Sequence, residues 1–224
     1  MIIVTIPAKN EEKTIGEVVA RVHRTLYKHP YVVLVACNVC TDRTGNVAKE
    51  AGALIFDVPE QGLANVFRAE MRETAKYPAD IIVHIDADGQ YSPAVIPELL
   101  RKLQEGYEMV LGNRLWHRPD GMPVTKYVFN QLGSLGYSTM LRKYLPDITT
   151  GLRVFTADVA RIGANLTSEY TYTQELTWRV IKARMKVASV DVNFYPRTGG
   201  NSRLMSGSAQ YLTRSAKDFW RFSR

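Results

Sequence analysis

The sequence has few of the residues that mark secreted, zinc-binding or membrane-spanning proteins. Its two cysteines cannot form a disulfide framework, so a reducing, cytoplasmic location is favoured. Its four histidines lack metal-ligand spacing and are expected to pack in the core or lie at the surface. No apolar run approaches the roughly 20 residues of a transmembrane helix. The apolar residues 2–6 have no basic segment before them and end at a proline, which predicts a buried strand rather than a signal peptide.

The net charge of +7 is unevenly distributed. From Arg179 onward, ten lysines and arginines accompany only two aspartates, whereas the preceding residues are close to neutral. A neutral body with a basic end predicts an anionic partner that approaches from one side. Phosphate groups, an anionic membrane surface and nucleic acid all remain open at this point.

Short apolar runs alternate with amphipathic segments through the first half of the chain. Runs rich in Val, Ile and Leu predict strands at 2–6, 32–36, 53–56, 80–85 and 108–112. Helical patterns lie between them, near 11–27, 41–51, 62–77 and 92–105. This alternation predicts an α/β fold with a Rossmann-like, mostly parallel sheet flanked by helices. Such sheets bind ligands beyond the carboxyl ends of their strands, so the residues just after each run are candidates for a site.

The second half loses this rhythm. Its pattern predicts a long amphipathic segment near 124–145, a strand at 152–155, a helix at 172–184, a strand at 187–194, and a final helix after a loop at 197–203. No repeat, low-complexity segment or linker interrupts the chain. We therefore expect a single domain over 1–224, with a nucleotide-binding half at 1–115 and an acceptor-binding half at 116–224.

The strongest chemical signal is Asp86-Ala87-Asp88 at the end of an apolar run. Side chains alternate along a strand, so Asp86 and Asp88 are expected to point the same way. Two adjacent carboxylates repel one another unless they share a cation, and their hard oxygens suit Mg²⁺ or Mn²⁺. Gln90 adds a possible third oxygen ligand. The alternative is that these residues only form the turn before the helix that opens at Ser92.

Two further segments follow strands at the same predicted edge. Pro7-Ala8-Lys9-Asn10-Glu11 follows the first strand, where Asn10 serves either to cap the next helix or to hold a base or ribose. Cys37-Asn38-Val39-Cys40 follows the second strand. Its C-x-x-C spacing is that of a thioredoxin-like redox pair or of half a zinc site, although no second cysteine pair exists. A loop in a nucleotide pocket is the favoured interpretation.

Together these motifs resemble family 2 glycosyltransferases of the GT-A fold, and most of all the dolichyl- or polyprenyl-phosphate mannose synthases. The resemblance lies in Pro7-Ala8-x-Asn10-Glu11-Glu12, Cys-Thr-Asp-Arg-Thr at 40–44, Asp86-Ala-Asp-Gly-Gln90, Gly112-Asn-Arg114, Asp147-Ile-Thr-Thr-Gly-Leu-Arg153, Glu175 and the loop 197–203. It therefore covers nearly the whole chain. It departs from the family at Cys37 and Asn38, where an acidic pair is usual, so the identity of the donor base stays open.

The resemblance implies a role for each matching residue. The implied nucleotide-sugar-binding set is Pro7, Ala8, Asn10, Glu11, Asn38, Asp86, Ala87, Arg197 and Arg203. The implied metal ligands are Asp86, Asp88 and Gln90, holding Mn²⁺ or Mg²⁺ with the donor diphosphate. The implied catalytic set is Asp88, Arg114, Asp147 and Glu175, with Arg114 facing an acceptor phosphate.

The resemblance also implies inverting transfer of one hexose, mannose or glucose, from GDP-mannose or a UDP-hexose to a polyprenyl or dolichyl phosphate. A hydroxyl acceptor would need a base, for which Asp147 and Glu175 are the candidates. A lipid phosphate is already anionic and needs positioning instead. The Gln-x-x-Arg-Trp motif of processive synthases is missing, which favours transfer of a single sugar.

A helix over 208–224 would gather four basic side chains on one face, namely Arg214, Lys217, Arg221 and Arg224. Such a helix either contacts the cytoplasmic face of a membrane peripherally or packs on the domain. Two other functions stay open. One is a soluble family 2 transferase that acts on a glycan or a small hydroxylated acceptor. The other is a nucleic-acid-binding module with a degenerate nucleotide fold, which would leave Asp86 and Asp88 without a role.

Overall fold

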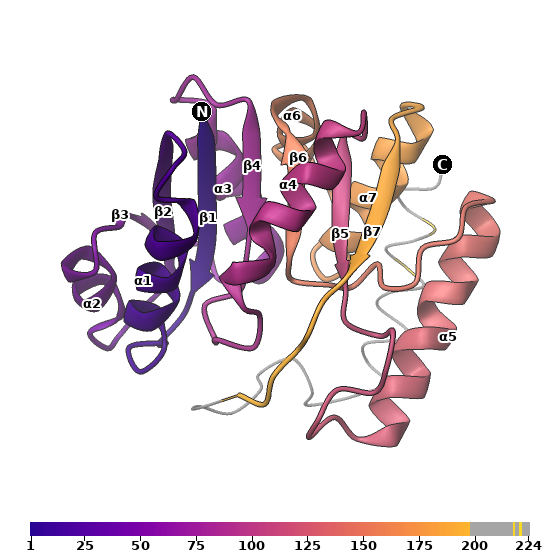
Figure 1. Cartoon of the computed structure of the whole chain (residues 1–224), viewed down its shortest axis with the longest axis horizontal. Coiled ribbons are helices and arrows are strands. Elements are labelled where there is room, and N and C mark those ends of the chain that lie inside the picture. Colours follow the sequence, from indigo (N-terminus) through magenta and orange to yellow (C-terminus); the bar gives the residue numbers. More distant parts are fainter. Residues whose placement is uncertain (198–216, 218–219, 221–224) are drawn as a thin grey trace.

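The computed structural model describes residues 1–197 together with Lys217 and Trp220. A seven-stranded sheet with the order β3-β2-β1-β4-β6-β5-β7 forms its centre (Figure 1). The strands are β1 (Ile2–Ala8), β2 (Tyr31–Asn38), β3 (Leu54–Val58), β4 (Ile81–His84), β5 (Met109–Asn113), β6 (Arg153–Thr156) and β7 (Val187–Asp191). All five strands predicted in the first half are present, and β1 and β2 each run two residues further than predicted. The two longer strands carry Pro7, Ala8, Cys37 and Asn38 within the sheet itself.

The sheet is parallel except for one strand. β6 pairs antiparallel with both β4 and β5, whereas β5 and β7 run parallel to each other. The predicted mostly parallel sheet is therefore confirmed, with β6 as an exception that its short apolar run did not reveal. Because β6 and β7 join the same sheet as β1–β5, the two predicted halves of the chain share one sheet rather than forming separate units.

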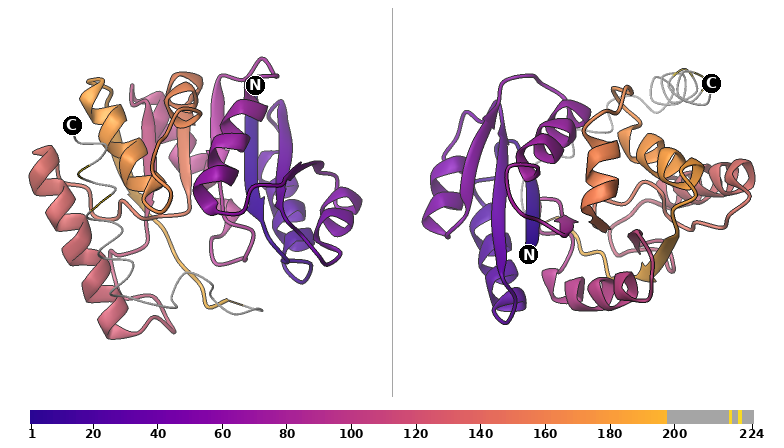
Figure 2. Two further views of the ribbon diagram at one scale, coloured as in Figure 1. Left: turned by 180° about the vertical axis from the view of Figure 1, so that it is seen from behind. Right: turned by 90° about the horizontal axis from the view of Figure 1, so that it is seen from above.

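Helices cover both faces of the sheet (Figures 1 and 2). One face carries α1 (Ile15–Leu26) and α4 (Ile96–Gln104), the latter preceded by a 3₁₀ turn at Pro93–Val95. The other carries α3 (Leu63–Thr74), α6 (Ala157–Gly163) and α7 (Tyr172–Lys182). The short α2 (Thr44–Glu50) packs beside α1 and next to β2 and β3. The seven-residue α6 was not predicted because it follows β6 directly and is too short to show a helical period.

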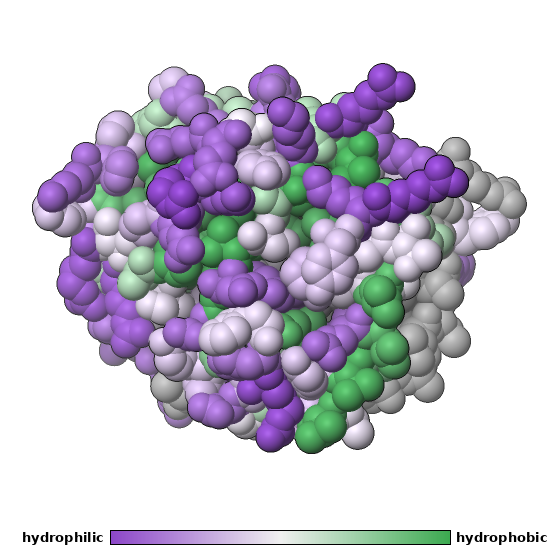
Figure 3. Space-filling model, turned by 45° about the vertical axis from the view of Figure 1, so that its right-hand side comes forward, coloured by the Kyte–Doolittle hydropathy of each residue, from purple (hydrophilic) through white to green (hydrophobic). Residues whose placement is uncertain are grey.

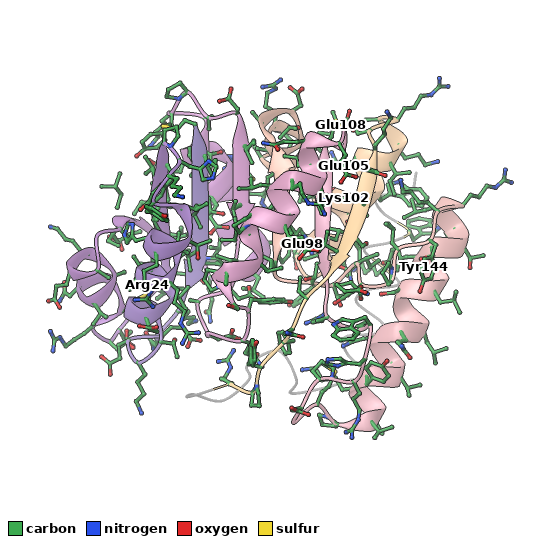
Figure 4. All side chains as sticks on the ribbon, in the orientation of Figure 1. Arg24, Glu98, Lys102, Glu105, Glu108 and Tyr144 are labelled. Carbon is green, nitrogen blue, oxygen red and sulfur yellow. A yellow bond between two sulfur atoms is a disulfide. The ribbon has the colours of Figure 1, made fainter. Side chains whose placement is uncertain are left out.

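The amphipathic pattern of each covering helix explains its placement. Helix α1 buries Ile15, Val18, Val19, Val22 and Leu26 against the sheet. Helix α4 buries its leucines and leaves Lys102 and Glu105 paired at 2.6 Å on its outer side (Figure 4). Burial on both faces accounts for the unbroken Val and Ile runs of the central strands.

Helix α5 (Val124–Leu141) differs from the covering helices because it buries polar residues and exposes apolar ones. Its buried residues are Ser134 and Ser138, whereas Val124, Leu132 and Leu135 are each more than half exposed. Figure 1 shows α5 at the edge of the molecule beside β7, and Figure 3 shows hydrophobic side chains gathered along its outer face. Among the described residues, no helix combines the length and the apolar character needed to cross a membrane. The predicted final helix lies outside the described residues, apart from Lys217 and Trp220.

Candidate active site

The Asp86-Ala87-Asp88 segment follows β4 at the carboxyl edge of the sheet, as predicted. Asp86 is half-buried and Asp88 is buried. Burial raises the pKa of the Asp86 carboxyl, and the nearby charge of Asp88 raises it further. A pair of oxygen ligands that repel one another is the chemistry that a divalent cation relieves.

Asp86 lies directly against the backbone of Gly151. A methyl group added at Gly151 would come within 1.8 Å of Asp86 Oδ2, so no other residue fits without moving the carboxylate. The same loop is fixed by Tyr91, whose hydroxyl accepts a hydrogen bond from the Gly151 amide at 2.8 Å and lies 3.1 Å from Thr150 Oγ1. Burial raises the pKa of Tyr91 to about 12, so its hydroxyl keeps its proton at neutral pH. Sequence reasoning included this loop in the resemblance but assigned no role to Gly151 or Tyr91.

A cation already contacts Asp88 in the form of Arg197. Its guanidinium donates to Asp88 Oδ2 at 2.7 Å and to Glu11 Oε1 at 3.2 Å. Burial raises the pKa of Glu11 and Asp88 adds to this, while Arg197 opposes both. Arg197 thus brings positive charge to two predicted donor-site carboxylates, and it stands where phosphates would need a partner.

Gln90, the third predicted metal ligand, is attached to the same segment. Its amide nitrogen Nε2 donates to the Tyr195 carbonyl at 3.0 Å, and its backbone carbonyl accepts from the Tyr195 amide. Its backbone amide donates to Asp88 Oδ1 at 3.0 Å. The structure therefore places Gln90 between Asp88 and the strand end that leads to Arg197.

Arg114 and Asp147 form a buried pair beside this site. Arg114 Nε donates to Asp147 Oδ2 at 2.7 Å and Nη2 donates to Oδ1 at 3.2 Å, while Thr149 binds the same carboxylate through its amide and hydroxyl. Burial alone would lower the pKa of Arg114, but the Asp147 carboxylate raises it well above its usual value. Because both carboxylate oxygens of Asp147 accept hydrogen bonds, we infer that Asp147 orients Arg114. These contacts do not favour the predicted role of Asp147 as a base.

Glu175 is likewise occupied, and by structural contacts. This fully buried carboxylate accepts hydrogen bonds from the amides of Thr167 and Ser168 at 2.7–3.0 Å and pairs with Arg179 at 2.6 Å. Burial alone would raise the pKa of Glu175, but the Ser168 and Thr167 hydrogen bonds lower it overall. Its contacts are those of a group that fixes the loop before α7, so we do not assign it acid–base chemistry.

The predicted nucleotide-binding residues meet where β1 and β2 end side by side. Pro7 and Ala8 pair with Ala36 and Cys37 in the register of the two strands. Asn10, with a φ of 52°, exchanges hydrogen bonds with Thr41 at 2.7 and 2.9 Å. Asn10 is therefore a link between the two loops rather than a helix cap.

The side chain of Asn38 forms hydrogen bonds with the neighbouring loop after β3. Its amide nitrogen donates to the carbonyls of Val58 and Glu60, and its oxygen accepts from the Gly62 amide. Cys37 and Cys40, on either side of it, are joined in a disulfide. The pair is therefore closed on itself, which rules it out as half of a zinc site in this form. Arg203 lies outside the described residues.

Two features of this region escaped sequence reasoning. His84 Nδ1 lies 3.2 Å from Glu70 Oε2 and 3.2 Å from Thr5 Oγ1, all buried beneath the Asp86 end of β4. Arg153 is also fully buried, and its Nη2 donates to the carbonyls of Ile148 and Thr150, which fixes the loop that meets Asp86. Neither has a local sequence signal, since a buried charge is recognised only by its distant partners.

The family model for glycosyl transferase family 2 matches residues 3–161, which is more than half of the chain. The chain belongs to that family. It is therefore a glycosyltransferase that uses a nucleotide-sugar donor, and its fold is GT-A, as predicted.

Several relatives match this glycosyltransferase over most of its length. The "Undecaprenyl-phosphate mannosyltransferase" of Micrococcus luteus is 26% identical over 219 residues, covering 92% of this chain and 88% of the relative. The "Polyprenol monophosphomannose synthase" of Mycolicibacterium smegmatis is 27% identical, covering 92% and 81%. These relatives confirm the resemblance to polyprenyl-phosphate mannose synthases that the motifs indicated.

A solved structure of similar fold is glucosyl-3-phosphoglycerate synthase from Mycobacterium tuberculosis, in complex with Mn²⁺, uridine diphosphate and phosphoglyceric acid. It superposes with a TM-score of 0.73 at 23% identity, over 99% of this chain and 78% of that one. At this identity the likeness establishes the fold alone.

Proposed function

We propose that this glycosyltransferase transfers one hexose from a nucleotide diphosphate sugar to a polyprenyl or dolichyl phosphate, with inversion at the sugar C1. The observation that carries the proposal is an apolar groove beside Arg114. The groove has a volume of about 430 Å³ and includes both neighbours of Arg114 in its lining, Asn113 and Leu115. A buried, permanently charged guanidinium next to an apolar groove matches an acceptor with a phosphate head and a hydrocarbon tail.

The groove continues along the exposed apolar face of α5. Its lining includes Trp116, Leu132, Leu135, Tyr144 and Leu145. Helix α5 contains no acidic residue, and the basic residues Arg142 and Lys143 follow it. An apolar face without acidic charge and with basic flanks is suited to an anionic bilayer, where a polyprenyl phosphate would be found. The names of the Micrococcus luteus and Mycolicibacterium smegmatis relatives support the same acceptor class.

The donor site fits a divalent cation. Asp86 and Asp88 supply hard oxygens, burial and then the charge of Asp88 raise the pKa of Asp86, and a guanidinium already pairs with Asp88. Among the described residues no group of three or more His, Cys, Asp or Glu side chains could hold a metal. We infer that Asp86 and Asp88 hold Mn²⁺ or Mg²⁺ together with donor phosphates, and that Gln90 contributes by holding Asp88. A bound cation would stabilise the departing diphosphate.

The residues themselves account for the positioning of the acceptor. Arg114, held rigid by Asp147, binds the acceptor phosphate, and Lys126 from the first turn of α5 adds a second positive charge. Burial lowers the pKa of Lys126, and the charges of Arg114 and Arg197 lower it further, so Lys126 lies within electrostatic range of both guanidinium groups. A phosphate oxygen then attacks C1 opposite the leaving diphosphate, which inverts that carbon. Because the phosphate is already ionised, no base is required, in agreement with the occupied oxygens of Asp147 and Glu175.

The proposal is tested by a transfer assay with radiolabelled GDP-mannose and UDP-glucose in Mn²⁺. Each donor is offered undecaprenyl phosphate in detergent, 3-phosphoglycerate or a soluble oligosaccharide. We expect a lipid-extractable product from one donor and none with the other acceptors. Transfer to phosphoglycerate or the oligosaccharide, with none to the lipid, would instead establish a soluble family 2 transferase.

Two variants assign the donor and acceptor roles. Asp88→Ala should abolish Mn²⁺-dependent nucleotide binding, measured by calorimetry, whereas Arg114→Ala should raise the KM for undecaprenyl phosphate far more than the Kd for the nucleotide. Arg101→Ala removes an exposed arginine that pairs with Glu105 at the end of α4, and it serves as the matched control. Wild-type nucleotide affinity in Asp88→Ala, or equal losses for donor and acceptor in Arg114→Ala, would contradict these assignments.

A further inference from the structure

The Cys37–Cys40 disulfide lies between the loops that the proposed function assigns to the donor nucleotide. Cys37 closes β2 in register with Ala8, and Cys40 Sγ contacts the Ala8 carbonyl at 3.5 Å. The next residue, Thr41, is the one that exchanges hydrogen bonds with Asn10. On the other side, Asn38 within the disulfide ring holds the backbone at Val58, Glu60 and Gly62. The ring therefore joins three loops that border the donor edge.

The disulfide also fixes an unfavourable backbone conformation. Val39, between the two cysteines, has a φ of 50°, which β-branched residues rarely adopt. Its neighbours Asn38 and Thr41 are held by hydrogen bonds, whereas the Val39 side chain is 44% exposed. Opening the disulfide would let residues 39–41 relax toward an ordinary conformation and weaken the hold on Asn10.

The two sulfurs differ in access. Cys37 is buried, at 4% exposure, whereas Cys40 is half-buried and follows the exposed Val39. A thiolate from solvent therefore reaches Cys40 Sγ, and Cys37 Sγ is the leaving group. The whole sequence contains no other cysteine, so no competing thiol within the chain can rearrange the pair.

We propose that Cys37–Cys40 is a reversible redox site that sets donor affinity, with the disulfide form as the tighter binder; this rests on the proposed function of the neighbouring loops. In the reducing direction a cellular dithiol attacks Cys40 Sγ, the S–S bond breaks, and a mixed disulfide forms. The second thiol of the reductant then displaces Cys40. The protein gains two electrons and two protons as two thiols, and the reductant becomes a disulfide. Oxidation by a small-molecule disulfide runs the same exchange backwards.

The direction follows from preorganisation. In the disulfide form the loops that meet the nucleotide are already ordered, so binding does not have to order residues 39–41. In the dithiol form, residues 39–41 must become ordered when the nucleotide binds, and this ordering lowers the affinity. We expect reduction to weaken nucleotide binding by about three- to tenfold, with the metal requirement unchanged.

The test compares the full-length protein in its two redox forms. Protein is oxidised with oxidised glutathione, or reduced with dithiothreitol and desalted without air, and free thiols are counted with Ellman's reagent; we expect none and two per chain, respectively. UDP and GDP are then titrated into each form with Mn²⁺ by calorimetry. The Cys37→Ser/Cys40→Ser double variant should bind like the reduced form, ignore the redox buffer and keep a cooperative thermal melt.

The outcomes separate this inference from the proposed function. Equal nucleotide affinity in both forms, tighter binding by the reduced form, or failure to form the disulfide in oxidised glutathione would each overturn the redox site while leaving the transferase intact. Failure of both forms to bind either nucleotide would overturn the donor site and the redox site together. If the double variant fails to fold, Cys40→Ser, which leaves the buried Cys37 in place, provides the same comparison.

Discussion

At the scale of single residues, the site depends on small or buried groups that support the charged ones. Asp86 and Asp88 are the proposed metal ligands, but Gly151 provides the space that Asp86 occupies, and Tyr91 fixes the loop that contains Gly151. Asp147 similarly acts by holding Arg114. The proposed ligand-binding residues were predicted from the sequence, whereas their supports lie far away in it: Tyr91 is 60 residues from Gly151, and Asp147 is 33 residues from Arg114.

Replacing Gly151 by alanine tests this dependence. The added methyl group must displace the Asp86 carboxylate, so we expect Mn²⁺-dependent nucleotide binding to fall by at least about tenfold, with a loss of stability of about 1–3 kcal/mol from overpacking. Calorimetric titration and thermal unfolding measure the two effects.

Gly133→Ala on α5 is the matched control, because a methyl group there meets no atom within 4 Å. Replacing a helical glycine by alanine should leave binding unchanged and raise stability by about 0.5–1 kcal/mol. Retention of full nucleotide affinity in Gly151→Ala would show that Asp86 is not needed where the structure places it.

At the scale of elements, α5 differs from every other described helix in having its apolar face outward. The polar Ser134 and Ser138 face the domain, where Ser138 Oγ binds the Ser134 and Leu145 carbonyls and the Leu145 amide. On the inner side these hydrogen bonds accompany the apolar packing of Tyr137 and Leu141 against the core. An exposed apolar helix face of this kind indicates a partner, and the proposed acceptor makes a lipid surface the expected one.

The double substitution Leu132→Ser/Leu135→Ser tests the role of this face. Both side chains are more than half exposed, so the domain should stay folded, while their loss from the bilayer should weaken binding to anionic vesicles about tenfold or more. Co-sedimentation with phosphatidylglycerol vesicles measures it. Leu54→Ser is the control, because Leu54 is 51% exposed on β3 at the opposite end of the sheet (Figure 1). Equal losses in both proteins would argue against a specific membrane face.

At the scale of the whole molecule, the sheet order decides which loops meet. Strands β1, β2 and β4 end at one edge, and the antiparallel β6 returns the chain so that residues 147–152 enter the same edge from the opposite direction. The segment after β7 crosses back to bring Arg197 onto Asp88. Five separate stretches of sequence thereby meet at one edge of the sheet.

Because ligands bind only this assembled edge, they should stabilise the whole fold. At nucleotide concentrations about 100 times Kd in Mn²⁺, linkage gives about 2.7 kcal/mol, which is a rise in Tm of roughly 5–10 °C for a chain of this size. Chelation with EDTA should remove most of the shift, and Asp88→Ala should show none. A shift that persists without metal would mean that the nucleotide is held by residues other than Asp86 and Asp88.

The sequence determined much of the fold, because strand and helix periodicities and the switch-point rule are local signals. They located all seven strands together with α1–α4, α5 and α7, and they placed Asp86 and Asp88 at the carboxyl edge of the sheet. They predicted β6 as a strand but not its antiparallel direction, which its four residues do not encode, and they did not predict the short α6.

The roles of the acidic residues were decided only by the tertiary structure. Asp147 and Glu175 are both carboxylates that a sequence reader would offer as bases. Their partners, Arg114 just after β5 and the amides of Thr167 and Ser168, occupy their oxygens in the folded chain. The same holds for Cys37 and Cys40, whose spacing fits several chemistries until the turn brings the sulfurs together. The sequence determines residue type and spacing, whereas the protonation, pairing and solvent access of a side chain depend on neighbours that are brought close only in the folded protein.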